Sequence, residues 1–315
     1  MNRIGVAAAA LTAVLYGSAY VAVAIALDAF TPVGVAIWRG IVGALVLGAL
    51  VLGALVVAPD RERPRRPSSA AAIRLGVIGL LGGGVFVLAM IAAVDLAGAT
   101  VTAVVAGLYA VSAALLAIPL LGERLAARTA AALVAALVGT VLLSDVWSGG
   151  QTPAGVAMAL VAAVAFGLFL VLSRRWASTY GLSGPVVGVV SLAVSAVASI
   201  AVAAVAGDDI GMSEPSLPAL VAVGWLALGP GAAATVLAVA AMRRLRAEQA
   251  APLLLLNPPT AAILAFVLLG ERLDALQLVG AVLTFTAIAV ATVGLPTRTA
   301  FRRNSRRGSA PPPRS

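Results

Sequence analysis

Long apolar runs with almost no charge recur from one end of this sequence to the other, and they restrict the fold more than any other feature. The run from Val33 to Val57 is typical, because Arg39 is its only charged residue. About 20 helical residues, each rising 1.5 Å, cross the roughly 30 Å hydrocarbon layer of a bilayer. In hydrocarbon every backbone amide and carbonyl needs an internal partner, which a helix provides. The runs therefore predict membrane-spanning helices.

Composition supports a lipid environment. Hydrophobic residues make up 62% of the chain, charged residues only 10%, and the mean hydropathy is +1.10. One soluble core cannot bury so much apolar surface. A membrane β-barrel would show segments of about ten residues that alternate between apolar and polar side chains, and these runs do not alternate. We therefore predict an all-α integral membrane protein.

The runs are divided by short segments that carry the charges, prolines and turn residues. The first run follows only Arg3 and is longer than the apolar core of a signal peptide, so it is predicted to be the first span. The ten predicted transmembrane helices are Ile4–Leu27, Val33–Val57, Ile73–Val94, Ala99–Leu121, Ala126–Val146, Pro153–Leu172, Gly184–Val205, Leu217–Met242, Ala250–Leu269 and Ala275–Gly294.

Basic residues predict how these helices are oriented. All 21 are arginines, and with a cytoplasmic amino terminus every one except Arg39 and Arg272 falls in a cytoplasmic segment. This agrees with the positive-inside rule, so we expect both termini in the cytoplasm. A sequence without lysine that is rich in Ala, Gly, Arg and Pro indicates a GC-rich bacterial genome, and hence the inner membrane. The same topology explains the net charge of +9 without nucleic-acid binding.

An internal repeat divides the chain in half. The hexapeptide Leu-Leu-Gly-Glu-Arg-Leu at residues 120–125 recurs at 268–273. Ser112-Ala113-Ala114 matches Thr260-Ala261-Ala262 at the same offset. Tyr16-Gly17 matches Phe166-Gly167 at an offset that is two residues larger. Each copy holds five spans, an odd number, so the two copies must be inverted in the membrane. We expect residues 1–147 and 148–294 to form two inverted five-helix repeats, followed by a disordered basic cytoplasmic tail at 295–315.

Inverted repeats are typical of secondary transporters that work by alternating access. The two Leu-Gly-Glu-Arg-Leu turns, Tyr16-Gly17-Ser18, Pro32 with Arg39, and Asn257-Pro258 together resemble the EamA type of the drug/metabolite transporter superfamily over residues 4–294. The resemblance implies a helical bundle whose central cavity is lined by spans 1, 3, 4, 6, 8 and 9. It also implies export or exchange of amino acids, other metabolites or drugs. Ala110 stands where the family often has proline, which leaves a kink in the fourth span open.

Arg39 lies about six residues inside the outer end of the second span, where an ionisable group is either functional or extends outward beside Trp38. If functional, its guanidinium is suited to a substrate carboxylate or phosphate. Asn257 precedes two prolines that break the ninth span, which indicates either a wet cavity or a packing kink. The substrate-binding residues that we predict are Tyr16, Tyr20, Arg39, Phe86, Met90, Tyr109, Phe169, Trp225, Thr235 and Asn257.

Other functions are disfavoured. With neither histidine nor cysteine, the chain lacks the usual metal ligands and nucleophile–base pairs, so we predict no metal, no cofactor and no enzyme activity. Glu123 and Glu271 are proton carriers or, as we prefer, stabilise the amino terminus of the helix that follows each of them. The paired Gly82–Gly84 and Gly229–Gly231 segments indicate close packing or a hinge. A carrier of anionic-headgroup lipids is the main alternative to a small-molecule transporter, and we expect a monomer.

Overall fold

The structure is a computed structural model. It describes the whole chain except residues 1–2, 58–67, 123–130, 132–133, 137, 140, 143–151, 181–183, 212, 215, 235, 238–240, 242–255 and 294–315. The basic tail therefore lies outside the described residues, as do Glu123 and most of the predicted fifth span. Within the described part the elements are all helices, which confirms the all-α fold class.

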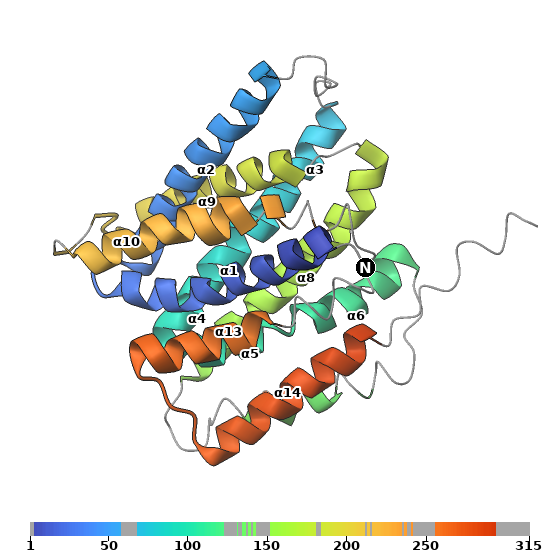
Figure 1. Cartoon of the computed structure of the whole chain (residues 1–315). Coiled ribbons are helices and arrows are strands. Elements are labelled where there is room, and N and C mark those ends of the chain that lie inside the picture. The colour runs from blue at the N-terminus through green and yellow to red at the C-terminus, as the bar shows by residue number, and fades with distance from the viewer. Residues whose placement is uncertain are drawn as a thin grey trace, which may run out of the picture.

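Most helices are long, and some are interrupted by π-helical segments, labelled η, in which each turn holds an extra residue. Figure 1 shows the helices side by side in one bundle. Their bounds are α1 Arg3–Leu27, α2 Pro32–Val57, α3 Ser69–Gly79, η1 Leu80–Val85, α4 Phe86–Ala97, α5 Ala99–Ala106, α6 Tyr109–Leu121, α8 Pro153–Tyr180, α9 Gly184–Ala206, α10 Leu217–Leu226, η2 Ala227–Ala233, α13 Asn257–Leu264, η3 Ala265–Leu269 and α14 Ala275–Val293.

The helices overlap the predicted spans wherever both are described, although α8 continues to Tyr180, beyond the predicted end at Leu172. Six helices in the described part are long and apolar enough to cross a membrane, beginning with Arg3–Leu27 and ending with Pro185–Ala206. Leu217–Ala233, Asn257–Leu269 and Ala275–Ala287 form shorter apolar helices. The described residues between 131 and 142 are also helical, in agreement with a fifth span. The chain is thus a multi-pass membrane protein.

Hydrogen bonds between connecting segments define two ends of the bundle. At one, which we call the loop end, the Thr31 hydroxyl donates to the Asp209 carbonyl at 2.8 Å, and the Thr152 hydroxyl donates to the Leu96 carbonyl at 3.0 Å. At the other, the arginine end, Arg175 donates to the Leu120 carbonyl at 2.9 Å. Helix α1 ends at the loop end and α8 begins there, so the first helices of the two halves run in opposite directions (Figure 1).

The halves are joined by two matching helix crossings, in which glycine lets the backbones approach closely. A Cβ on Gly17 of α1 would lie 2.5 Å from the Asn257 carbonyl oxygen and 2.7 Å from the Thr260 Cβ of α13. A Cβ on Gly167 of α8 would lie 2.8 Å from the Ser112 Cβ of α6. These are the residues that the repeat pairs in sequence. Each half therefore places its first helix against the fourth span of the other half.

The glycine-rich segments Gly82–Gly84 and Gly229–Gly231 lie in η1 and η2. Helix η1 packs on α9, where a side chain on Gly83 would overlap the Ser191 carbonyl. Helix η2 packs on α2, where a Cβ on Gly43 would lie 3.4 Å from the Ala227 carbonyl. Close packing is thus the role of Gly83, and the π turns widen each helix at the matched position.

The fourth span is interrupted without a proline at Ala110. Helix α5 ends at Ala106, Gly107 and Leu108 form a turn, and α6 begins at Tyr109. A Cβ on Gly107 would lie 3.4 Å from the Pro258 ring of α13, so this break faces the break in the ninth span. The fourth span is therefore interrupted at Gly107 and Leu108, although Ala110 replaces the proline.

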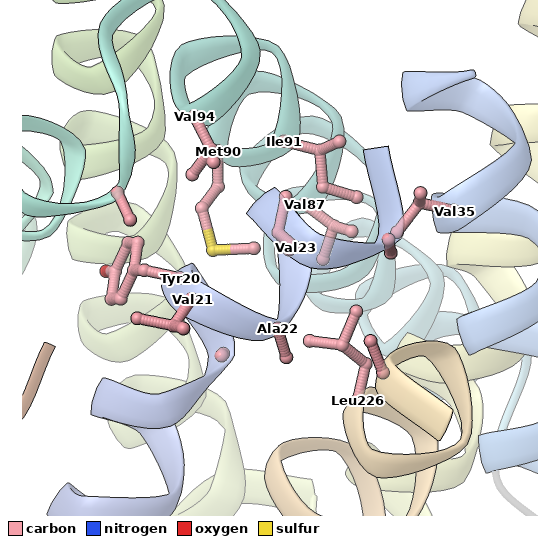
Figure 2. Packing of buried hydrophobic residues seen from close by; sticks show 14 of the residues in the cluster. Tyr20, Val21, Ala22, Val23, Val35, Val87, Met90, Ile91, Val94 and Leu226 are labelled. Atoms are coloured by element: carbon pink, nitrogen blue, oxygen red, sulfur yellow. The ribbon is translucent and has the colours of Figure 1, made fainter. Parts of the chain in front are cut away.

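The main buried core surrounds the carboxy-terminal part of α1 and combines residues from both halves. In Figure 2, Tyr20 and Val23 of α1 lie against α4, and Ala22 faces Leu226 of α10. Val35 of α2 closes the same cluster. In lipid, contacts of this kind hold helices together through close packing, since lipid chains are as apolar as the side chains.

Glu271 has the structural role that we expected, although the helix that it stabilises is a different one. Its carboxylate accepts the backbone N–H groups of Ala99 at 2.9 Å and Thr100 at 3.0 Å, the first residues of α5. The following helix, α14, is instead capped by Asp274, whose carboxylate accepts the backbone N–H of Gln277 at 2.7 Å. Our expectation that Glu271 stabilises α14 was therefore wrong. The carboxylate reaches across to the other half, where a Gly98 turn with φ of 78° exposes the two N–H groups.

Replacing Glu271 by Gln should lower the stability of the protein in detergent by about 1–3 kcal/mol, because two charge-assisted hydrogen bonds to a helix terminus become weaker neutral ones. The measurement is the Tm of the purified variant. Arg272→Gln, at the exposed neighbouring residue, is the control and should stay within about 0.5 kcal/mol of the parent. Equal Tm values for the two variants would contradict the role given to the carboxylate.

Gly17→Ala and Gly167→Ala should each destabilise the protein by about 1–3 kcal/mol, because the new methyl group forces the two halves apart. Gly48→Ala in α2 is the matched control, since a Cβ there has no neighbour within 4 Å. That variant should be neutral or more stable by up to about 1 kcal/mol, the helix propensity gained. Thermal unfolding in detergent measures all three, and an unchanged Tm for both Gly17→Ala and Gly167→Ala would refute the crossings.

Candidate functional site

Three tyrosines and one arginine lie near one another among the helices of the first half. Tyr16 of α1 lies within electrostatic range of Arg39 of α2 and of Tyr109 of α6. Tyr20, one helical turn after Tyr16, lies within range of Tyr109 as well. We call these four residues the tyrosine–arginine cluster. Its phenol and guanidinium groups are polar side chains inside a largely apolar bundle, and an ionisable side chain in such a place is a candidate for a functional site.

Tyr109 connects this cluster to a group of aromatic rings from both halves. Its ring centroid lies 5.1 Å from that of Phe166 of α8, edge to face. Phe166 in turn lies 4.6 Å from Phe86 of α4 and stacks on Phe169 at 5.3 Å. We call Phe86, Tyr109, Phe166 and Phe169 the aromatic cluster. Such stacked and edge-to-face arrangements hold the rings in a defined geometry.

Two further contacts fix this surface in the bundle. Met90 of α4 is only 4% exposed and lies beside the Tyr20 ring in Figure 2. A Cβ on Gly82 would lie 2.5 Å from the Phe169 ring, so η1 packs directly on the aromatic cluster. The π-helical segment therefore sets the position of Phe86 and Met90, which follow it in sequence.

Arg39 turns toward the inside of the bundle, whereas its neighbour Trp38 turns toward the loop end. The Trp38 indole donates to the Ile210 carbonyl at 3.1 Å and is 39% exposed. The Arg39 side chain is partly buried, and its Nε has no hydrogen-bond partner among the described residues. The functional interpretation of Arg39 stays a prediction.

The structure thus places Tyr16, Tyr20, Arg39, Phe86, Met90, Tyr109 and Phe169 in neighbouring positions. The remaining predicted residues are Trp225, Asn257 and Thr235. Trp225 is 45% exposed and donates to the Ser18 hydroxyl at 2.9 Å. Ser18 follows Tyr16 by two residues and therefore projects about 200° around α1 from it, on nearly the opposite side of the helix. Asn257 is buried at the Gly17 crossing, and its Oδ1 has no partner in the described part. Thr235 lies outside the described residues.

Sequence reasoning did not find a row of three buried hydroxyls on α9. Ser191, Ser195 and Ser199 recur every four residues, so they share one face of the helix. None of their hydroxyls has a hydrogen-bond partner among the described residues, and Ser195 and Ser199 are fully buried. The spacing of the serines in an apolar span was the available signal.

A cavity of about 430 Å³ lies at the loop end. It is lined by residues of the α4–α5 turn and of the α13–α14 turn, including Asp95, Gly98, Glu271 and Gln277. No predicted substrate-binding residue lines it. The described residues contain no group of carboxylates that could hold a metal ion.

Comparison with known families and structures gives a consistent picture. Residues 3–145 and 153–293 each match the EamA-like transporter family. A solved structure described only as "Crystal structure of protein" is 22% identical, covers 92% of this chain with 96% of its own, and superposes with a TM-score of 0.63, which shows a shared fold. Comparison with curated proteins yields no match.

The two family matches confirm the resemblance noted in the motifs. Members of this family are membrane transporters of small molecules. The chain belongs to the EamA-like transporter family, within the drug/metabolite transporter superfamily.

Proposed function

We propose that the protein is a secondary transporter that exports or exchanges small amphipathic metabolites, such as amino acids or related compounds or drugs, by alternating access. In this proposal ten helices form two inverted repeats, residues 1–147 and 148–294, and the basic tail 295–315 is cytoplasmic. The protein acts as a monomer in a bacterial inner membrane, with both termini in the cytoplasm.

The observation that supports this function best is the pair of equivalent crossings between the halves. The contact of Gly17 with α13 and the contact of Gly167 with α6 are of the same kind. When two inverted halves pack on each other in equivalent ways, exchanging their conformations produces a state of similar energy that opens to the other side. A protein built this way has the two states that alternating access requires.

The proposed substrate site consists of the tyrosine–arginine cluster and the aromatic cluster. Its residues come from α1, α2, α4, α6 and α8, and so from both halves. A ligand held between halves that move against each other can be released to either side. Ligands with one polar group and an apolar body fit a site with a polar and an aromatic part.

A carrier of anionic lipid headgroups is the second candidate, and Arg39 is the observation that favours it. A guanidinium near the loop end is suited to a lipid phosphate as well as to a soluble anion. Enzyme activity is not part of the proposal, because the chain has neither histidine nor cysteine and the clusters contain no carboxylate.

The topology can be tested with single cysteines, since the chain has none of its own. A membrane-impermeant maleimide should label Ser213→Cys and Arg272→Cys in intact cells, because both residues are exposed at the loop end. Ser68→Cys, exposed before α3, should be labelled only after the membrane is permeabilised. Labelling of Arg272→Cys only in permeabilised cells would contradict the inverted arrangement.

Transport can be measured by counterflow in proteoliposomes, with amino acids, organic acids and cationic drugs as separate test compounds. We expect saturable counterflow of at least one compound, and Tyr109→Ala should slow it about tenfold or more, because this side chain belongs to both clusters. Tyr109→Phe keeps the ring and should retain part of the rate, while Gly48→Ala should retain all of it.

The same liposomes distinguish the second candidate. Movement of a labelled anionic lipid between leaflets, without counterflow of any soluble compound, would establish the lipid carrier in place of the proposed function. A Tm measured for each variant shows whether a lost rate reflects lost folding.

A further inference from the structure

The charge of Arg39 is not balanced by any acidic residue inside the described bundle. Acidic residues of the described part lie in connecting segments or, for Asp95, at an exposed position near the end of α4. They are Asp28, Asp95, Asp208, Asp209, Glu214, Glu271 and Asp274. Glu271 is occupied by the α5 amide groups. A guanidinium stays protonated in proteins, so the tyrosine–arginine cluster carries an uncompensated positive charge.

A partly buried cation without an acidic partner is costly, and a bound anion lowers that cost. The Arg39 Nε–H is an unused donor among the described residues. Tyr16 and Tyr109 lie within electrostatic range of one another, and Tyr16 lies within range of Arg39. Phenol groups can donate hydrogen bonds to the same anion. The polar part of the site is therefore built for one negative charge.

The apolar part of the site consists of aromatic rings. Phe166 and Phe169 stack with their ring planes at 20°, and Phe86 lies beside them at 33° to Phe166. Aromatic faces bind planar apolar groups by offset stacking. Because Tyr109 belongs to both clusters, a ligand of modest length can contact the cation with one end and the rings with the other.

A positive charge on the ligand would have no favourable partner in this arrangement. The described part of the bundle offers no carboxylate to accept a ligand ammonium near Arg39, and the guanidinium itself repels it. Aromatic faces do attract cations, but these rings adjoin a fixed positive charge through Tyr109 and Tyr16. A zwitterion would gain the contact of its carboxylate with Arg39 and lose the solvation of its ammonium.

We infer that the substrate is an organic anion with one negative charge, a planar apolar body and no positive charge, of which an aryl carboxylate is the simplest example. The inference rests on the proposed function and narrows its substrate class. It separates simple organic acids from the amino acids and cationic drugs that the wider family resemblance includes.

Three compounds with the same phenyl ring test it: 3-phenylpropionate, an anion; phenylalanine, which adds an ammonium to it; and phenethylamine, a cation. Binding is measured by the ligand-dependent rise in Tm of the full-length protein in detergent. We expect 3-phenylpropionate to bind about tenfold or more tightly than phenylalanine and phenethylamine. Equal or tighter binding of phenylalanine, or no binding of 3-phenylpropionate, would overturn the inference.

Substitutions of Arg39 test whether its guanidinium binds the negative charge of the ligand. Arg39→Gln should weaken 3-phenylpropionate binding about tenfold or more, and Arg39→Lys should restore part of it. Arg272→Gln, an exposed arginine at the loop end, should bind like the parent. If Arg39→Gln folds and binds 3-phenylpropionate like the parent, Arg39 is not the receptor for the anion and the inference fails.

Two further measurements distinguish this inference from binding of a lipid headgroup and from a failure of the proposed transport function. If phosphatidylglycerol raises the Tm in an Arg39-dependent way and 3-phenylpropionate does not, the anion is a lipid headgroup and the inference is overturned. Counterflow of phenylalanine but not of 3-phenylpropionate would overturn the inference and leave the proposed transport function standing. Absence of counterflow for every compound in the wider screen would instead count against the transport function itself.

Discussion

The close crossing of α1 with α13, repeated by α8 with α6, is the contact on which the rest of the fold depends. In lipid there is little hydrophobic gain when one apolar helix leaves lipid to contact another, so association rests on van der Waals packing at small residues. Gly17 and Gly167 provide that packing between the halves. Because each glycine follows an aromatic residue of the site, Tyr16 or Phe166, the crossings also place the site. The same local sequence joins the halves and positions their aromatic side chains.

Much of this fold was accessible from sequence because lipid imposes simple rules. Span length and arginine distribution predicted the helices and their boundaries closely at α1, α2 and α9. The repeat predicted which segments correspond, and the structure adds that corresponding segments meet across the halves. Sequence cannot supply that pairing, because Gly17 and Thr260 are 243 residues apart and no local pattern connects them. For the same reason Glu271 was assigned to the helix next to it, although its partners are the distant Ala99 and Thr100.

The site was predicted in part. Residue type identified Tyr16, Arg39 and Tyr109, because polar groups in an apolar span are exceptional. Trp225 was selected on the same grounds, yet its indole serves a hydrogen bond to Ser18 at a half-exposed position. A helix face cannot be assigned to the cavity or to lipid from a span that is apolar on all sides. The serines of α9 were overlooked because single hydroxyls are common in membrane helices, and only their burial distinguishes them.

The π-helical segment η1 has a consequence for the side chains that follow it. One extra residue in a helical turn rotates everything beyond it by about 100° relative to an uninterrupted α-helix. Phe86 and Met90 lie directly beyond η1, so the face that α4 presents to Tyr20 and Phe166 is set by that single widened turn. In an ordinary α-helix of the same sequence, these two side chains would point away from the site. The helix therefore carries its angular alignment in a backbone irregularity, stabilised by α9 of the opposite half.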